Sequence, residues 1–108
     1  MLKKTEFKIF SAAYDRINNC CLIIEDAKPK VVYTYLKDKG LNNIGNLTGD
    51  LKPIYCNWDK GLLLASGGKL QYYNGEKLVT LEESPNNCTG VYVRNGRVIV
   101  SDVEENRI

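Results

Sequence analysis

Four cysteines are the residues best suited to metal or redox chemistry, because the chain contains no histidine. They are Cys20, Cys21, Cys56 and Cys88. Structural zinc sites use cysteine pairs with about two to four residues between them, whereas adjacent cysteines in a strand point to opposite faces. The lack of histidine also removes the usual base for a nucleophilic cysteine. We therefore expect reduced, mostly buried thiols and neither metal nor cofactor.

Carboxylates are the second candidates, since paired acidic side chains can act as general acid and base. Acidic residues occur at Glu82 and Glu83, at Asp102, and at Glu104 and Glu105. Nothing in their spacing fixes the separation across a cleft that a glycosidase pair requires. No glycine-rich phosphate-binding loop is present either. The sequence therefore predicts a protein without enzymatic activity.

Aromatic side chains remain as candidates for binding. Trp58, Tyr72, Tyr73 and Tyr92 lie in or beside segments with the composition of β-strands. Most such residues serve cross-strand packing, but an exposed aromatic face can stack on sugars or form a protein interface. Because Tyr72 and Tyr73 are adjacent in a strand, they point to opposite faces, and we expect one of them to be exposed. These four residues form the candidate interface or ligand-binding site.

The positions of these aromatic residues depend on a series of turns in the C-terminal half. Three residue pairs, flanked by β-branched, aromatic and aliphatic residues, have the composition of two-residue hairpin turns. They are Gly67-Gly68, Asn74-Gly75 and Asn95-Gly96. These dipeptides supply the positive φ angles that type I′ turns need. We therefore expect an antiparallel β-meander over residues 51–108.

Residues 1–50 are expected to form an N-terminal segment that contains one hairpin. Apolar side chains recur at helical spacing before Asn18, but Asn18 and Asn19 interrupt that pattern. We expect an irregular or short helical segment there, with helix and strand both open for residues 5–18, followed by strand, turn and strand. Residues 38–48 are rich in glycine and asparagine and are expected to be a loop. The predicted fold class is all-β.

Composition and charge bear on partners and location. The 108 residues carry a net charge of only +2 and no dense basic run, so we expect no specific nucleic-acid binding. The longest apolar run, Cys20 to Ile24, is too short to cross a membrane. Charged residues soon after the N-terminus break any signal-peptide core. We expect a cytoplasmic protein with one small hydrophobic core.

Two segments of the C-terminal half carry a resemblance to known proteins. A glycine, an apolar strand, a tight turn, a basic residue and a second apolar strand follow Gly61 and again follow Gly90. Propeller blades repeat hairpins of this kind. From Trp58 to Tyr73 and from Gly90 to Asp102, the chain resembles the β-propeller virion proteins of tailed phages and prophages. That group includes packaged-DNA stabilisation proteins, which plug the head-to-tail channel, and tail-associated propeller proteins.

The resemblance implies a structural module of a head–tail connector or tail, made in the host cytoplasm and incorporated into the virion. Its implied partners are other virion subunits, or further copies paired through sheet edges. Propellers close with about four to eight blades, whereas about one to two blade-like units are expected here. An incomplete propeller leaves strand edges exposed for association. The alternative is a small carbohydrate-binding β module that uses the exposed aromatic residues.

Overall fold

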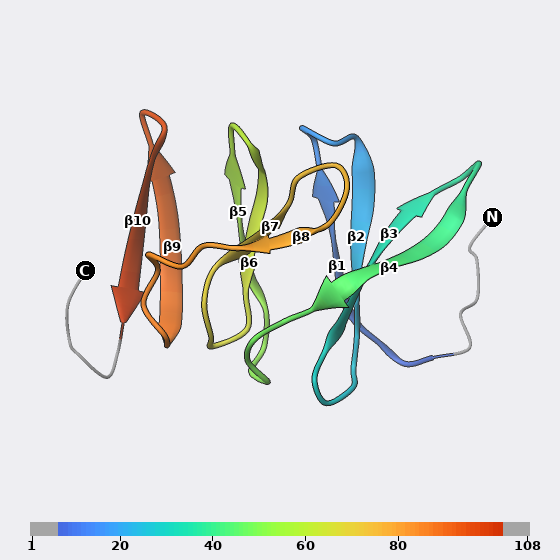
Figure 1. The fold of residues 1–108 in the computed structure, drawn as a ribbon, viewed down its shortest axis with the longest axis horizontal. Coiled ribbons are helices and arrows are strands. Elements are labelled where there is room, and N and C mark those ends of the chain that lie inside the picture. Colours follow the sequence, from blue (N-terminus) through green and yellow to red (C-terminus); the bar gives the residue numbers. More distant parts are fainter. Residues whose placement is uncertain (1–6, 103–108) are drawn as a thin grey trace.

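The computed structural model describes residues 7–102, and these residues form ten β-strands and no helix (Figure 1). In chain order the strands are β1 (Ile9–Asp15), β2 (Cys20–Glu25), β3 (Val31–Leu36), β4 (Gly40–Asn46), β5 (Ile54–Trp58), β6 (Gly61–Ala65), β7 (Gln71–Tyr73), β8 (Leu78–Thr80), β9 (Cys88–Arg94) and β10 (Arg97–Asp102). The fold is therefore all-β, as the sequence predicts.

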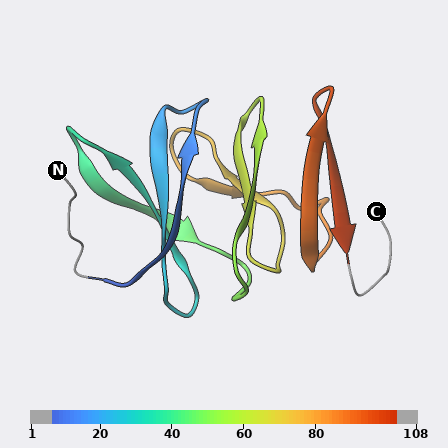
Figure 2. The same cartoon turned by 180° about the vertical axis from the view of Figure 1, so that it is seen from behind.

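The strands form three antiparallel sheets, in which strands consecutive in the chain are neighbours. The first sheet contains β1–β4, the second contains β5–β8, and the third is the β9–β10 hairpin. Figures 1 and 2 show the sheets side by side along the longest axis, with the second sheet in the middle. The first sheet and the hairpin are therefore the two ends of a stack.

Strand β6 is buried on both faces, which explains its uninterrupted apolar sequence. Leu62 and Leu64 pack against Leu22, Ile24 and other residues of the first sheet. On the opposite face, Leu63 and Ala65 belong to a second cluster, with valines of the hairpin. The stack therefore has two hydrophobic cores, one on each side of the second sheet, so the expectation of a single core is wrong.

The first strands of the three sheets lie next to one another. The hydroxyl groups of Ser11 in β1 and Tyr55 in β5 form a hydrogen bond. On the other side of β5 lies β9, and the indole Nε1 of Trp58 donates to the Gly96 carbonyl at 3.3 Å. Strands β1, β5 and β9 therefore lie along one common side of the stack.

The expected irregular or helical segment before Asn18 is wrong for the described residues, because Ile9–Asp15 form strand β1. Its backbone pairs with β2, from Ile9 opposite Glu25 to Asp15 opposite Cys20. The fully buried Asp15 carboxylate accepts hydrogen bonds from the backbone N–H groups of Ile17 and Asn18, at 3.1 Å each. Asn18 and Asn19 therefore lie in a turn between two strands, and Asn19 has a positive φ of 54°.

The expected loop over residues 38–48 is also wrong, because most of it is strand β4. Gly40 has a positive φ of 68° where the chain leaves the preceding turn, and the strand from Gly40 to Asn46 pairs with β3. Exposed polar side chains dominate this strand, and Ile44 is its one buried residue. Its composition therefore resembled that of a loop, whereas its backbone completes a four-stranded sheet.

The three predicted turns differ in length. At Asn95-Gly96, Arg94 pairs with Arg97 and both turn residues have positive φ, 52° and 76°, so this is the predicted two-residue turn. Asn74-Gly75 lies in a four-residue connection, since Tyr73 pairs with Leu78.

The third pair, Gly67-Gly68, lies in a wider connection between β6 and β7, in which Leu64 pairs with Gln71. Gly67 still has a positive φ of 79°. The predicted two-residue turns are therefore wrong at Asn74-Gly75 and at Gly67-Gly68, although both pairs lie in chain reversals. The length of each connection is set by the pairing of the strands around it.

Candidate functional site

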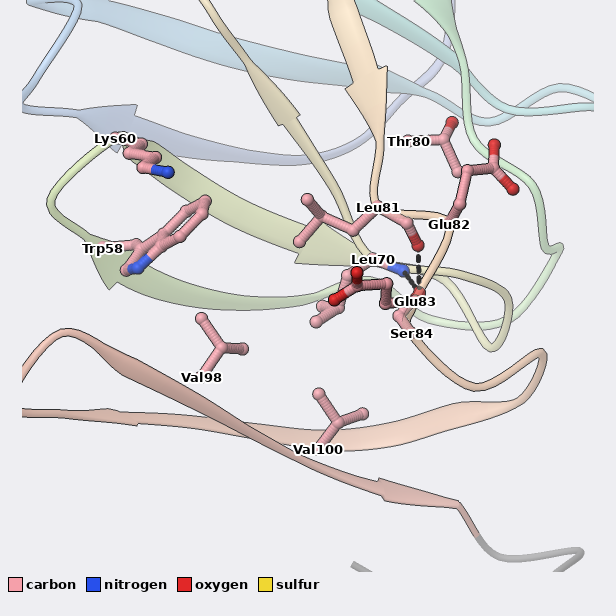
Figure 3. Close-up of a pocket in the computed structure, with 10 residues that line it drawn as sticks. All are labelled: Trp58, Lys60, Leu70, Thr80, Leu81, Glu82, Glu83, Ser84, Val98 and Val100. Carbon is pink, nitrogen blue, oxygen red and sulfur yellow. Dashed lines mark hydrogen bonds between the residues drawn. The ribbon is translucent and has the colours of Figure 1, made fainter.

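A pocket of about 600 Å³ lies between the second sheet and the β9–β10 hairpin (Figure 3). Its lining combines apolar, aromatic and charged side chains from both sheets. These are Trp58, Lys60, Leu70, Thr80, Leu81, Glu82, Glu83, Ser84, Val98 and Val100. The pocket is the candidate functional site because it brings an aromatic ring, carboxylates and an ammonium group together.

Trp58, at the end of β5, is held on several sides. Its indole nitrogen is hydrogen-bonded to the Gly96 carbonyl of the hairpin turn. The Tyr72 ring meets it edge-on, with ring centroids 5.4 Å apart, and the Lys60 ammonium lies 5.1 Å from its ring centroid. These contacts fix the indole as one wall of the pocket.

The apolar part of the lining comes from Leu70 and Leu81 on one side and from the hairpin on the other. Figure 3 shows Val98 and Val100 projecting from β10 toward the pocket. Leu70 is only 1% exposed, and Leu81, Val98 and Val100 pack against the second core. The valines that hold the hairpin on the second sheet therefore also border the open space.

Hydrogen bonds hold the segment from Leu81 to Ser84 in place. The Ser84 hydroxyl accepts from the Leu70 backbone N–H at 3.1 Å and donates to the Leu81 carbonyl at 2.7 Å. The Lys69 ammonium donates to the carbonyls of Glu82 and Ser84, at 2.9 and 3.1 Å. The carboxylates of Glu82 and Glu83 are consequently presented by a fixed segment, and both residues are exposed.

The structure separates the four aromatic candidates. Trp58 and Tyr72 contact each other beside the pocket, whereas Tyr73 packs against the first core on the opposite face of the second sheet. Neither tyrosine of the adjacent pair is exposed; both are half-buried, because the second sheet is covered on both faces. Tyr92 lies apart from them, on the hairpin, and is 59% exposed.

Sequence reasoning missed the apolar lining of the pocket. Leu70, Leu81, Val98 and Val100 have the residue types of any strand interior. Their role depends on which sheets face each other, and no motif in the sequence encodes that.

The cysteines are free thiols and lie in different surroundings. Cys20 and Cys88 are buried, whereas Cys21 and Cys56 are half-buried. Burial raises the pKa of Cys20 to about 11, with a smaller contribution from the charges of Asp15 and Cys21. Burial also raises the pKa of Cys88. Both buried thiols are therefore protonated near neutral pH and poor nucleophiles.

Within residues 7–102, no three histidine, cysteine or acidic side chains are close enough to hold a metal ion. Of the acidic candidates, Glu82 and Glu83 line the pocket, and Asp102 is buried at the end of β10. Glu104 and Glu105 lie outside the described residues.

Comparisons with protein-family models, curated proteins and solved structures find no match to this chain. Among the described residues there is no helix long and apolar enough to cross a membrane.

Proposed function

We propose that the chain is a non-enzymatic structural and interaction module built from β-propeller blades. Two successive four-stranded antiparallel meanders, packed face to face with their first strands adjacent, support this proposal. Propellers repeat four-stranded sheets in this way around an axis. The β9–β10 hairpin continues the series, since it packs on the far face of the second sheet.

The spacing of equivalent strands supports a repeat of blade size. The second strand of each sheet begins at Cys20, Gly61 and Arg97, at intervals of 41 and 36 residues. Known propeller repeats have about 40 to 50 residues. The proposed blades are thus close to the usual length, although only two of the three sheets have four strands.

The faces at the two ends of the stack carry this proposal, because both expose apolar side chains. On the hairpin, Tyr92 pairs with Ile99, and these side chains are 59% and 42% exposed. At the other end, the outer face of the first sheet carries Tyr14, which is 52% exposed, and Ile23 paired with Tyr33. Such faces are typical of surfaces that meet another protein.

We propose that these end faces pack against further blades supplied by other subunits. The assembly that we favour is a phage or prophage virion, at the head–tail connector or in the tail, by resemblance to propeller virion proteins. In that setting the module is synthesised in the host cytoplasm and contributes a rigid surface to the particle.

Light scattering after size exclusion tests the association. We expect the chain to form oligomers as its concentration rises, and Tyr92→Lys combined with Ile99→Lys to restore the monomer. Asn57→Lys, at an exposed position of β5, is the matched control and should leave association unchanged. A parent chain that stays monomeric at every concentration would contradict the proposed module.

The pocket supports a second candidate function, a small carbohydrate-binding module. Aromatic rings stack on sugars, and the carboxylates of Glu82 and Glu83 can accept hydrogen bonds from sugar hydroxyl groups. Glycan-array binding that is abolished by Trp58→Ala but retained by Tyr92→Ala would favour this candidate. No binding to any glycan would remove it.

A further inference from the structure

Folding gathers cations that are scattered in the sequence at one end of the strands. Because neighbouring strands are antiparallel, the turns β1–β2, β5–β6, β7–β8 and β9–β10 lie at this end (Figures 1 and 2). We call their surface, formed by residues 16–19, 59–60, 74–77 and 94–97, the turn rim. It carries five exposed cations and two exposed carboxylates. The cations are Arg16, Lys60, Lys77, Arg94 and Arg97, and the carboxylates are Asp59 and Glu76.

Contacts between the four turns make the turn rim one continuous surface. A Cβ atom placed on Gly61 or on Gly75 would lie 3.5 or 3.4 Å from the side-chain amide of Asn18. The first turn therefore abuts the second and the third. The hydrogen bond from the Trp58 indole to the Gly96 carbonyl joins the second turn to the fourth.

The cations of the turn rim are not used by the fold. Within residues 7–102, none of the five forms an ion pair with a carboxylate. Arg94 and Arg97 are direct cross-strand partners, so two like charges share one face of the hairpin. Such pairs destabilise a sheet. The arginine pair therefore does not serve the stability of the hairpin.

At the opposite end of the strands, carboxylates are in excess among the exposed charges. The connections β2–β3, β4–β5, β6–β7 and β8–β9 expose two cations, Lys28 and Lys52. Their exposed carboxylates belong to Asp26, Asp50, Glu82 and Glu83. Of their other lysines, Lys30 is buried, and the Lys69 ammonium donates to two backbone carbonyls. The positive charge is therefore a property of the turn rim and not of the whole surface.

We propose that the turn rim docks an acidic surface of a partner protein. The inference deepens the proposed function and rests on it, because it names the chemistry by which another subunit would attach. A rim with carboxylates among its cations suits a protein face of mixed charge better than the uniform charge of a nucleic-acid backbone. Further blades stacked on either end face would lengthen the rim and leave it exposed.

The size of the rim and its arginine pair define what the partner presents. The molecule measures 43 by 21 Å across this end, which is large enough for a contact of about 800 Å² on each partner. Packed sheets lie about 10 Å apart, so we expect partner carboxylates at that spacing. The guanidinium groups of Arg94 and Arg97 can each bind both oxygens of a carboxylate, which makes this pair the expected centre of the contact.

Trp58 supplies a direct readout, since it is the single tryptophan of the chain and is bonded to the fourth turn of the rim. The probe is a synthetic oligoglutamate peptide, which contains no aromatic residue. We expect a saturable change in Trp58 fluorescence at low salt. The response should disappear as salt is added, because contacts between exposed charges are screened.

Paired substitutions of equal charge separate the turn rim from the rest of the surface. Arg94→Gln with Arg97→Gln should weaken oligoglutamate binding by about tenfold. This variant should be at least as stable as the parent, because it removes a like-charge pair, so the test does not depend on a damaged fold. Lys28→Gln with Lys52→Gln removes the same charge at the opposite end. It is the matched control and should bind like the parent.

Three outcomes would overturn the proposed docking surface: no saturable response to oligoglutamate, equal weakening by the two paired variants, or tighter binding of an oligothymidylate of the same charge. Light scattering on the same samples distinguishes this failure from that of the proposed function. A chain that self-associates but ignores oligoglutamate contradicts the docking surface alone. A chain that stays monomeric but binds oligoglutamate through Arg94 and Arg97 supports the docking surface and contradicts association through the end faces.

Discussion

The two interfaces of the stack use the same kind of packing but differ in completeness. Between the first and second sheets, apolar side chains are framed by partly buried polar contacts, including those of Gln71 with Asn46 and Thr48. Asn18 adds another, since its side chain donates to the Tyr73 carbonyl at 2.7 Å. The interface between two four-stranded sheets is thus closed at several points.

On the far face of the second sheet, the described residues contribute only the two strands of the hairpin to cover four strands. Valines and the Trp58–Gly96 hydrogen bond hold the hairpin, and a pocket remains beside β10. Within residues 7–102, the second interface is therefore less completely covered than the first. Stability should therefore concentrate at the first interface.

The largest effect is expected from shortening one of two adjacent leucines of β6. Leu64 faces the first interface and Leu63 the second, and both are fully buried. Leu64→Ala should lower the free energy of unfolding by about 3 kcal/mol, and Tm by about 15 °C. Leu63→Ala should cost less, because the hairpin can relax toward the pocket. Equal losses in thermal denaturation would contradict the difference between the interfaces.

A smaller effect is expected at the hairpin turn. Gly96 has φ 76°, where a β-branched residue is strained by about 1–2 kcal/mol. Gly96→Val should therefore destabilise the hairpin, whereas Arg97→Val places the same side chain on the adjoining strand at little cost. Circular dichroism during thermal unfolding measures both variants. If Gly96→Val matches Arg97→Val, the turn is not type I′.

The smallest effect concerns the buried thiol of the first interface. Because the pKa of Cys20 is raised to about 11 in the folded chain, ionisation is easier in the unfolded chain. Stability is complete below the ordinary thiol pKa, about 8.5, and declines as pH rises toward 11. Cys20→Val should flatten this decline. Cys21→Val, at a half-buried thiol, is the control and should leave the decline unchanged. Urea unfolding at a series of alkaline pH values measures this decline in the free energy of unfolding. Equal declines in the parent chain and in Cys20→Val would contradict the contribution of the buried thiol.

Turn chemistry made the second half of the fold predictable. Asn95-Gly96 and the alternation along residues 91–100 specify a hairpin in which every second side chain faces the core. Glycines marked the other reversals, but the lengths of those connections depend on pairing between strands. Local sequence therefore predicted antiparallel sheets better than it predicted their register.

The first sheet was harder to predict because its edge strands lack strand-like patterns. Apolar residues of β1 and its turn, such as Phe10, Tyr14 and Ile17, repeat at helical spacing, and all three are exposed. Strand β4 is polar and glycine-rich, and it exists because β3 offers a partner. The pocket was hidden for a related reason, since its lining is defined by which sheet faces which.

Hydrogen–deuterium exchange at single amides tests most directly that the hairpin interface is open. In the dilute chain, the amides of Val98 and Val100 should exchange quickly, because the register of the hairpin points them to the edge of β10 that no strand of residues 7–102 covers, whereas that of Ile99 is protected by β9. Amides of Leu62, Leu63 and Leu64 in β6 should exchange most slowly of all. Equal protection of Val98, Ile99 and Val100 would show that the edge is already paired and would contradict the account.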